Sequence, residues 1–198
     1  RIFVCTAIAT LIWVPVGVWV GLQPKIANKM QPIIQFLAAF PANLLFPVVV
    51  IYIIKYQLNI NIWTSPLIIL GTQWYILFNV IAGVQTLPSS AFYAVKSMHL
   101  PRVIWWQKLI LPGIFPHLLT GIITAVGGAW NASIVAEYVE WGDNQLIATG
   151  LGSYISNCYR SGDFVHLGLG IFVMCVFVLV INRVVWLPLC HLAQERCQ

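Results

Sequence analysis

Few side chains in this sequence could ligate a metal or perform acid–base chemistry, and they lie far apart. The histidines occur singly, and none is paired at the spacing of a metal site: His99, His117, His166 and His191. No segment reads G-x-x-x-x-G-K-[ST], so the chain has no P-loop for ATP. We predict that the chain is not an enzyme and that it binds neither a metal nor a cofactor.

A second group of polar side chains interrupts segments that are otherwise apolar. Gln73, Asn79, His117 and Asn131 are the clearest cases. Each is costly in hydrocarbon and should face protein or a water-filled path. Two interpretations are open, hydrogen bonds between helices or the lining of a translocation path. The candidates for such a path are Gln73, Asn79, Trp130 and Asn131.

The elements that position these residues are suited to a membrane rather than to water. The 198 residues are 60% hydrophobic and only 8% charged, whereas soluble domains carry about 25% charged residues. Several charge-free runs reach or approach the ~20 residues that a helix needs to cross a bilayer. They are apolar on every face, which favours helices over the alternating strands of a barrel. We predict one all-α transmembrane domain over 1–198 with about five spans, at about 2–22, 33–54, 64–84, 109–135 and 164–187.

Glycine and proline positions predict how these spans pack and bend. Gly17 and Gly21 form a small-xxx-small pair in the first span, which suits close packing against another helix. Pro41 and Pro47 fall inside the second span. Because proline lacks the N–H that a helix interior needs, we predict that this span is bent or broken.

Lysine and arginine residues give the five-span topology a direction. The loops 23–31 and 86–108 and the C-terminal tail share one side, and that side carries seven of them: Lys25, Lys29, Lys96, Arg102, Lys108, Arg183 and Arg196. The other side carries three: Arg1, Lys55 and Arg160. Because basic loops favour the cytoplasm, we place 86–108 there. The net charge of +5 flanks the spans, so it indicates contact with membrane lipid rather than with nucleic acid.

The loop 86–108 is the most informative segment of the chain. It contains Thr86-Leu87-Pro88 and Ala91-Phe92-Tyr93-Ala94-Val95, and it leads into a span through Leu111-Pro112. We predict two short helices ending in a proline that sets the angle between loop and span. Such a loop is a rigid, exposed surface that another protein can push.

This stretch resembles the coupling loop of ABC-importer permeases, the inner-membrane components of binding-protein-dependent transport. Their pattern is E-A-A, three residues, G, nine residues, I, one residue and L-P. Aligned on Leu111-Pro112, it puts Tyr93 at the glutamate, Ala94 and Val95 at the alanines, His99 at the glycine and Leu109 at the isoleucine. The spacing is kept, but the glutamate and the glycine are absent.

Other segments resemble the same family in the same order. They are Gln31-Pro32 with Ala39-Phe40-Pro41-Ala42 and Phe46-Pro47, then Gly121, Ala129-Trp130 and Ala136-Glu137, then Gly150-Leu151-Gly152 with Ile155. The resemblance covers nearly the whole chain. It is nearest to permeases for nitrate, sulfonate, taurine and bicarbonate, and it implies the core of a type I importer. The chain begins at Arg1 rather than Met, which suggests a fragment or one half of a longer, duplicated anion permease.

The resemblance implies a function and a set of partners. A cytoplasmic ABC ATPase dimer would grip the coupling loop, for which the residues are Tyr93, Ala94, Val95, His99, Arg102, Leu109, Leu111 and Pro112. A second permease copy or sister half would complete the pore, and an extracytoplasmic binding protein would deliver the solute. The expected location is the bacterial inner membrane, with several crossings. The path residues named above would then line a route for a small oxyanion.

Two other functions are compatible with an apolar, helical chain. A secondary transporter or channel subunit is the main alternative, but no acidic residue lies inside a predicted span, which disfavours coupling to protons or sodium. A membrane enzyme would need clustered His, Asp or Glu at a membrane face, and the sequence has no such cluster.

Overall fold

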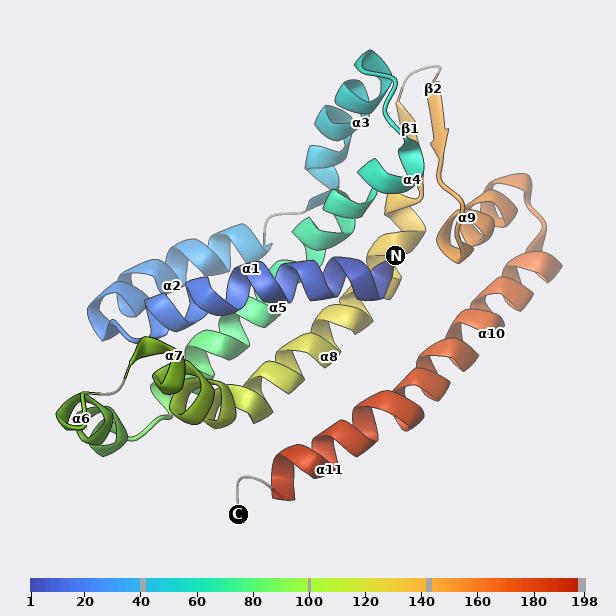
Figure 1. Ribbon diagram of the computed structural model, residues 1–198. Coiled ribbons are helices and arrows are strands. Elements are labelled where there is room, and N and C mark those ends of the chain that lie inside the picture. The colour runs from blue at the N-terminus through green and yellow to red at the C-terminus, as the bar shows by residue number, and fades with distance from the viewer. Residues whose placement is uncertain (40–41, 100, 142–143, 196–198) are drawn as a thin grey trace.

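Long apolar helices dominate the computed structural model of the chain, which describes residues 1–39, 42–99, 101–141 and 144–195 (Figure 1). Four continuous helical runs within this part are long and apolar enough to cross a membrane: Ile2–Gly21, Ile60–Gln85, Arg102–Ala136 and Phe164–Ala193. The predicted all-α membrane fold with about five spans is confirmed. The first run is α1 (Ile2–Gly21), and the second contains α4 (Ile60–Trp63) and α5 (Ser65–Gln85).

The predicted span 33–54 is not one helix. Its residues are divided between α2 (Pro24–Ala39), a 3₁₀ turn η1 (Ala42–Leu45) and α3 (Phe46–Lys55). Pro47 stands in the first turn of α3, where a missing N–H costs nothing because that group has no partner within the helix. Pro41 lies outside the described residues. A ten-residue helix such as α3 is about 15 Å long, half of what a bilayer core requires.

Two short helices lie in the predicted loop 86–108, and the second of them begins the third apolar run. They are α6 (Ser89–Ser97) and α7 (Arg102–Trp105), followed by a π-helical turn η2 (Trp106–Ile110) and α8 (Leu111–Ala136). The polar stretch 137–163, for which the sequence predicted no elements, forms a hairpin and a helix. Strands β1 (Tyr138–Trp141) and β2 (Asn144–Ile147) pair antiparallel with Val139 opposite Leu146, and α9 (Leu151–Ser161) follows.

Helix α5 is the centre of the bundle and packs against α1 on one side and α8 on the other. Gly17 and Gly21 make the first contact possible, because a Cβ at either would lie 2.7 or 2.8 Å from Val80 or Val84 of α5. The predicted small-xxx-small packing is therefore confirmed. On α8, Gly121 meets α5 in the same way. Buried side chains of α1, α5 and α8 form two core clusters, one shared with α3 and the hairpin and one shared with η2.

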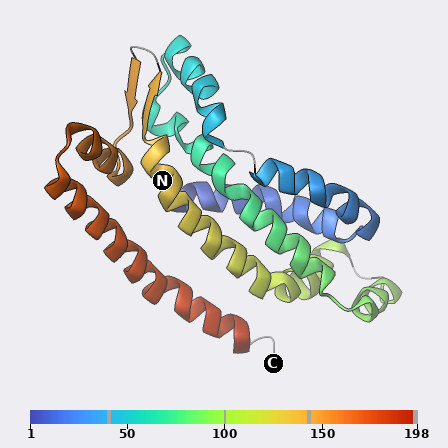
Figure 2. The same cartoon turned by 180° about the vertical axis from the view of Figure 1, so that it is seen from behind.

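The last helical run stands beside the bundle instead of inside it (Figure 2). It comprises α10 (Phe164–Ile181), a π-helical turn η3 (Asn182–Trp186) and α11 (Leu187–Glu195). Only 6% of the most apolar window of this run is buried, compared with 50% for the run that contains α5. Its exposed side chains are apolar, as expected of a helix that faces lipid or another membrane subunit.

The two ends of the bundle differ in structure. Residues 22–24 and the helices α6 and α7 gather at one end, which we call the basic end (Figures 1 and 2). The hairpin, α9 and Arg1 gather at the other, which we call the hairpin end. Helices α2 and α3 together cross from the first end to the second. Residues 24–31 belong to α2, so the predicted loop 23–31 is wrong, but this part of the chain lies at the same end as α6 and α7.

Candidate functional site

The loop helices α6 and α7 project beyond the ends of α5 and α8 (Figure 1). Side-chain contacts attach them to the bundle. Phe92 of α6 packs edge-to-face on Trp105 of α7, with ring centroids 6.2 Å apart. Leu87 lies directly over Gly113 of α8, where a Cβ would overlap its side chain. These contacts fix the loop to the start of α8 as one rigid unit.

The outer surface of this loop carries most of the residues predicted to meet an ATPase. Tyr93 is 72% exposed. The side chains are exposed at Tyr93, Ala94, His99, Arg102, Leu111 and Pro112, and half-buried at Val95 and Leu109. Six of these eight residues are therefore accessible to a partner protein, and the other two are partly covered.

His99 occupies a special backbone conformation between α6 and α7. Its φ is +49°, in the left-handed region that glycine adopts at little cost. The ring Nδ1 lies 3.0 Å from the carbonyl oxygen of Ser97. This is the position at which the family pattern has glycine. The chain has lost the glycine but has kept the turn that a glycine would favour.

The predicted path residues do not form one line through the bundle. Gln73 is buried between α1 and α5, where its Oε1 accepts a hydrogen bond from Trp13 Nε1 at 3.0 Å. Trp130 packs against the core, and Asn131 is exposed on α8. Asn79 faces Gly121 of α8, which is ten residues and about 15 Å from Asn131. Gln73 thus has the helix-linking role that was one of its two interpretations.

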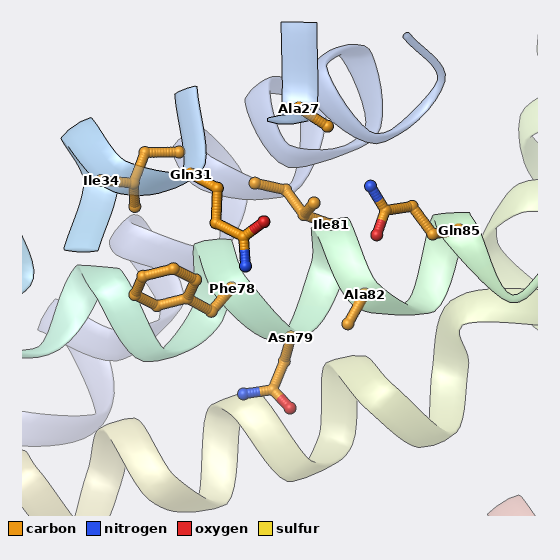
Figure 3. A pocket seen from close by; sticks show the side chains of 8 residues that line it. All are labelled: Ala27, Gln31, Ile34, Phe78, Asn79, Ile81, Ala82 and Gln85. Carbon is orange, nitrogen blue, oxygen red and sulfur yellow. The ribbon is translucent and has the colours of Figure 1, made fainter. Parts of the chain in front are cut away.

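Asn79 is the predicted path residue that borders a cavity. The cavity has a volume of about 310 Å³ and lies between α2 and α5 (Figure 3). Two glutamines that the sequence analysis did not select, Gln31 and Gln85, also line it. Both lie near the ends of predicted spans, where polar residues are common, so the sequence alone provided no reason to select them. Only the packing of α2 against α5 shows that they line one cavity.

At the hairpin end, Glu137 joins α8 to α9. Its Oε2 accepts hydrogen bonds from the backbone N–H groups of Gly152, at 2.9 Å, and Ser153, at 3.3 Å. Its Oε1 pairs with Arg1 Nη1 at 2.9 Å. Gly150 provides no capping side chain for α9, so the carboxylate of Glu137 takes that role at the positive end of the helix dipole.

Burial raises the pKa of the Glu137 carboxyl above its ordinary value, although Arg1 and the two N–H groups oppose the shift. The close approach depends on two glycines. A Cβ at Gly150 would overlap the Glu137 carboxylate, and one at Gly152 would lie 2.5 Å from the carbonyl oxygen of Ser133. The Gly150-Leu151-Gly152 segment thus keeps α9 against the end of α8. Among the described residues, no group of three His, Cys, Asp or Glu side chains could hold a metal ion.

Comparison with known families gives this arrangement a context. Residues 14–186 match the model of the family described as "Binding-protein-dependent transport system inner membrane component". The chain belongs to this family. It is thus a permease-type, multi-pass component of the inner membrane, and the resemblance to ABC-importer permeases seen in the sequence is confirmed.

Individual relatives belong to the group that the sequence resembles. A bicarbonate transport system permease protein of Synechocystis is 28% identical over 178 residues, which are 89% of this chain and 60% of that protein. A nitrate import permease protein of Leptolyngbya laminosa is 25% identical, covering 93% of this chain and 63% of the relative. The taurine transport system permease protein of Escherichia coli is 26% identical, covering 90% of this chain and 62% of that protein. The chain thus spans less than two thirds of the length of these relatives.

A solved structure supports the fold. The methionine ABC transporter, in a crystal form described as inward-facing, superimposes with a TM-score of 0.71 at 16% identity, covering 98% of this chain and 90% of that one. At this identity the likeness shows the fold alone, which is that of an ABC-importer permease.

Proposed function

We propose that the chain is the membrane subunit of an ATP-driven importer for a small anion. The observation that carries this proposal is the anchored, exposed loop formed by α6 and α7 between the two central spans. A cytoplasmic ATPase dimer would grip this loop, a second permease copy or sister half would complete the pore, and an extracytoplasmic binding protein would deliver the solute. Closing of the ATPase would then move α8 through η2 and the contact between Leu87 and Gly113.

Two features favour an anion as the solute. The relatives named above are permeases for bicarbonate, nitrate and taurine. In addition, the first 136 residues contain no Asp or Glu but seven basic residues: Arg1, Lys25, Lys29, Lys55, Lys96, Arg102 and Lys108. A surface with one sign of charge raises the local concentration of ions of the opposite sign.

Reconstitution tests the proposal. The full-length protein would be placed in proteoliposomes with its ATPase and binding protein, and uptake of labelled bicarbonate, nitrate and taurine would be measured together with ATP hydrolysis. Ala94→Arg puts a charged side chain on the exposed face of α6. We expect ATP hydrolysis without transport, because the ATPase can no longer hold the loop.

Gln57→Arg is the matched control, since it adds the same charge at an exposed position near the hairpin end. Uptake by this variant should equal that of the wild type. Coupled uptake that survives Ala94→Arg unchanged would show that the loop is not the point at which the ATPase acts.

A further inference from the structure

The cavity between α2 and α5 is unusual because its polar groups are amides. It is lined by Gln31, Asn79 and Gln85 together with apolar side chains such as Phe78 and Ile81. The amide of Gln31 points from α2 toward α5, and that of Gln85 points from α5 toward α2 (Figure 3). Two side chains from different helices are thus directed at the same space.

These amides have hydrogen-bonding capacity to spare. Within the part of the chain that the structure describes, neither Gln31 nor Gln85 has a side-chain hydrogen bond to protein, and both are exposed. The amide of Asn79 points from α5 toward α8, away from α2 (Figure 3), and its Nδ2 donates to the Tyr75 carbonyl oxygen at 2.8 Å, so Asn79 lines the cavity without directing its amide at the space between Gln31 and Gln85. An amide NH₂ group offers two donors, so Gln31 and Gln85 each have donors available for a ligand in the cavity.

The electrostatic surroundings favour an anion over a cation. Lys25 and Lys29 are exposed on α2, the helix that carries Gln31. No carboxylate occurs anywhere in the first 136 residues. Neutral donors hold an anion less tightly than a guanidinium does, and a conducting site must bind weakly enough to release its ion. The cavity is also large enough, since its volume exceeds by severalfold the ~30 Å³ that one water molecule occupies.

We propose that this cavity is an oxyanion site at the inner end of the translocation path, where Gln31 and Gln85 donate hydrogen bonds to a solute such as nitrate, bicarbonate or a sulfonate. The proposal rests on the proposed function and adds the location of the solute on its way to the basic end. Along α5 the cavity extends from the level of Phe78 and Asn79 to Gln85, which is in the last turn of the helix at the basic end.

Gln85 also connects the site to the coupling loop. It borders a second cavity, of about 780 Å³, whose other walls include Leu87, Phe92 and Tyr93. A displacement of α6 by the ATPase would change the surroundings of Gln85 on one side while its amide faces the solute on the other. The site therefore lies where opening and release can be linked to the nucleotide cycle.

Transport by amide variants tests the site. In the reconstituted importer, Gln31→Leu and Gln85→Leu each remove donors while keeping an apolar stem of similar size. Hydrogen bonds to charged groups contribute about 1.5–3 kcal/mol, so uptake should fall roughly tenfold or more. For Gln31→Leu, whose side chain does not border the second cavity beside α6, the ATPase activity stimulated by the binding protein should change little. Gln35→Leu, an exposed glutamine one turn along α2 outside the cavity, is the matched control and should leave uptake unchanged.

Cysteine labelling tests the site without relying on uptake. Ala82→Cys places a thiol in the cavity wall, and a membrane-impermeant thiol reagent applied from the cytoplasmic side should label it above the background of the native cysteines. Nitrate should slow the labelling. Leu11→Cys, which is 76% exposed on the apolar face of α1, should not be labelled.

The two proposals fail in different ways. Normal wild-type uptake, combined with normal uptake by both leucine variants, would overturn the site and leave the proposed function standing. A failure to label Ala82→Cys would also overturn the site, since the cavity would then be filled by lipid. If the wild type imports none of the three anions, the proposed function fails, and nitrate protection of the Ala82→Cys thiol decides the site by itself.

Discussion

His99 has a backbone conformation that suits glycine better than histidine. Its φ of +49° lies where a side chain with a Cβ is strained. His99 lies after α6 and before α7, and Phe92 of α6 packs on Trp105 of α7. Histidine in place of glycine therefore raises the conformational energy of the turn but does not abolish the turn.

Restoring the glycine should stabilise the loop. We expect His99→Gly to raise the free energy of unfolding by up to ~1 kcal/mol, because left-handed backbone costs a non-glycine residue roughly that amount. Thermal unfolding of the purified protein in detergent would measure the change. Met98→Gly is the matched control, because the φ of Met98 is not positive, so there glycine should lower the stability through its greater freedom in the unfolded chain. A lower midpoint for His99→Gly would contradict the assignment of strain.

At the scale of elements, the junction of α8 and α9 depends on a side chain at the end of α8 that caps the start of α9. Helix α9 has no capping residue of its own, and Glu137 at the end of α8 accepts hydrogen bonds from its first turn. The arrangement requires that Gly150 carry no side chain. A carboxylate, a helix start and a glycine thus form one structural unit at the hairpin end.

Gly150→Ala should disrupt this unit. The new methyl group would occupy the space of the Glu137 carboxylate, leaving it or the N–H groups of α9 without partners, at a cost of about 1–3 kcal/mol. The midpoint of thermal unfolding reports the loss. Gly168→Ala is the matched control, because nothing lies within 4 Å of a Cβ at that position of α10 and alanine favours helices. Equal midpoints for the two variants would show that Glu137 does not depend on the glycine.

At the scale of the whole molecule, the proposed coupling loop of α6 and α7 and the hairpin lie at opposite ends of the same central helices. Helix α8 runs from η2 at the basic end to Glu137 at the hairpin end, and its close contact with α5 is continuous between them (Figure 1). A force applied to α6 can reach the far end only if the loop is firmly attached to α8. The attachment consists of Leu87 over Gly113 and Phe92 against Trp105.

Weakening this attachment should lower transport per ATP. Phe92→Ala removes an aromatic pair that contributes about 0.5–1.5 kcal/mol beyond its buried area, so the ratio of uptake to hydrolysis should fall roughly two- to tenfold. The exposed face of α6 that would meet the ATPase is left in place. Val103→Ala, at a position of α7 that is 65% exposed, should keep the wild-type ratio. An unchanged ratio of uptake to hydrolysis in Phe92→Ala would contradict the mechanical role of the loop.

The sequence by itself determined the membrane class and the position of the loop that holds α6 and α7. These features depend on local properties, namely the length of apolar runs, the lack of charge within them and the prolines that bound the loop. Gly17 and Gly21 also predicted close packing correctly, because small residues at helical spacing suit few other purposes. What the sequence left open was the partner helix, which the structure identifies as α5.

Only the tertiary structure decided which polar residues meet. Gln73 and Asn79 are alike in sequence terms, yet one bonds Trp13 of α1 and the other borders a cavity with Gln31 of α2. The division of 33–54 into α2 and α3, and the capping of α9 by Glu137, likewise depend on distant contacts. The physical reason is the same in each case. An amide or a carboxylate is satisfied by whichever donor or acceptor the packing brings within about 3 Å, and no local pattern specifies that neighbour.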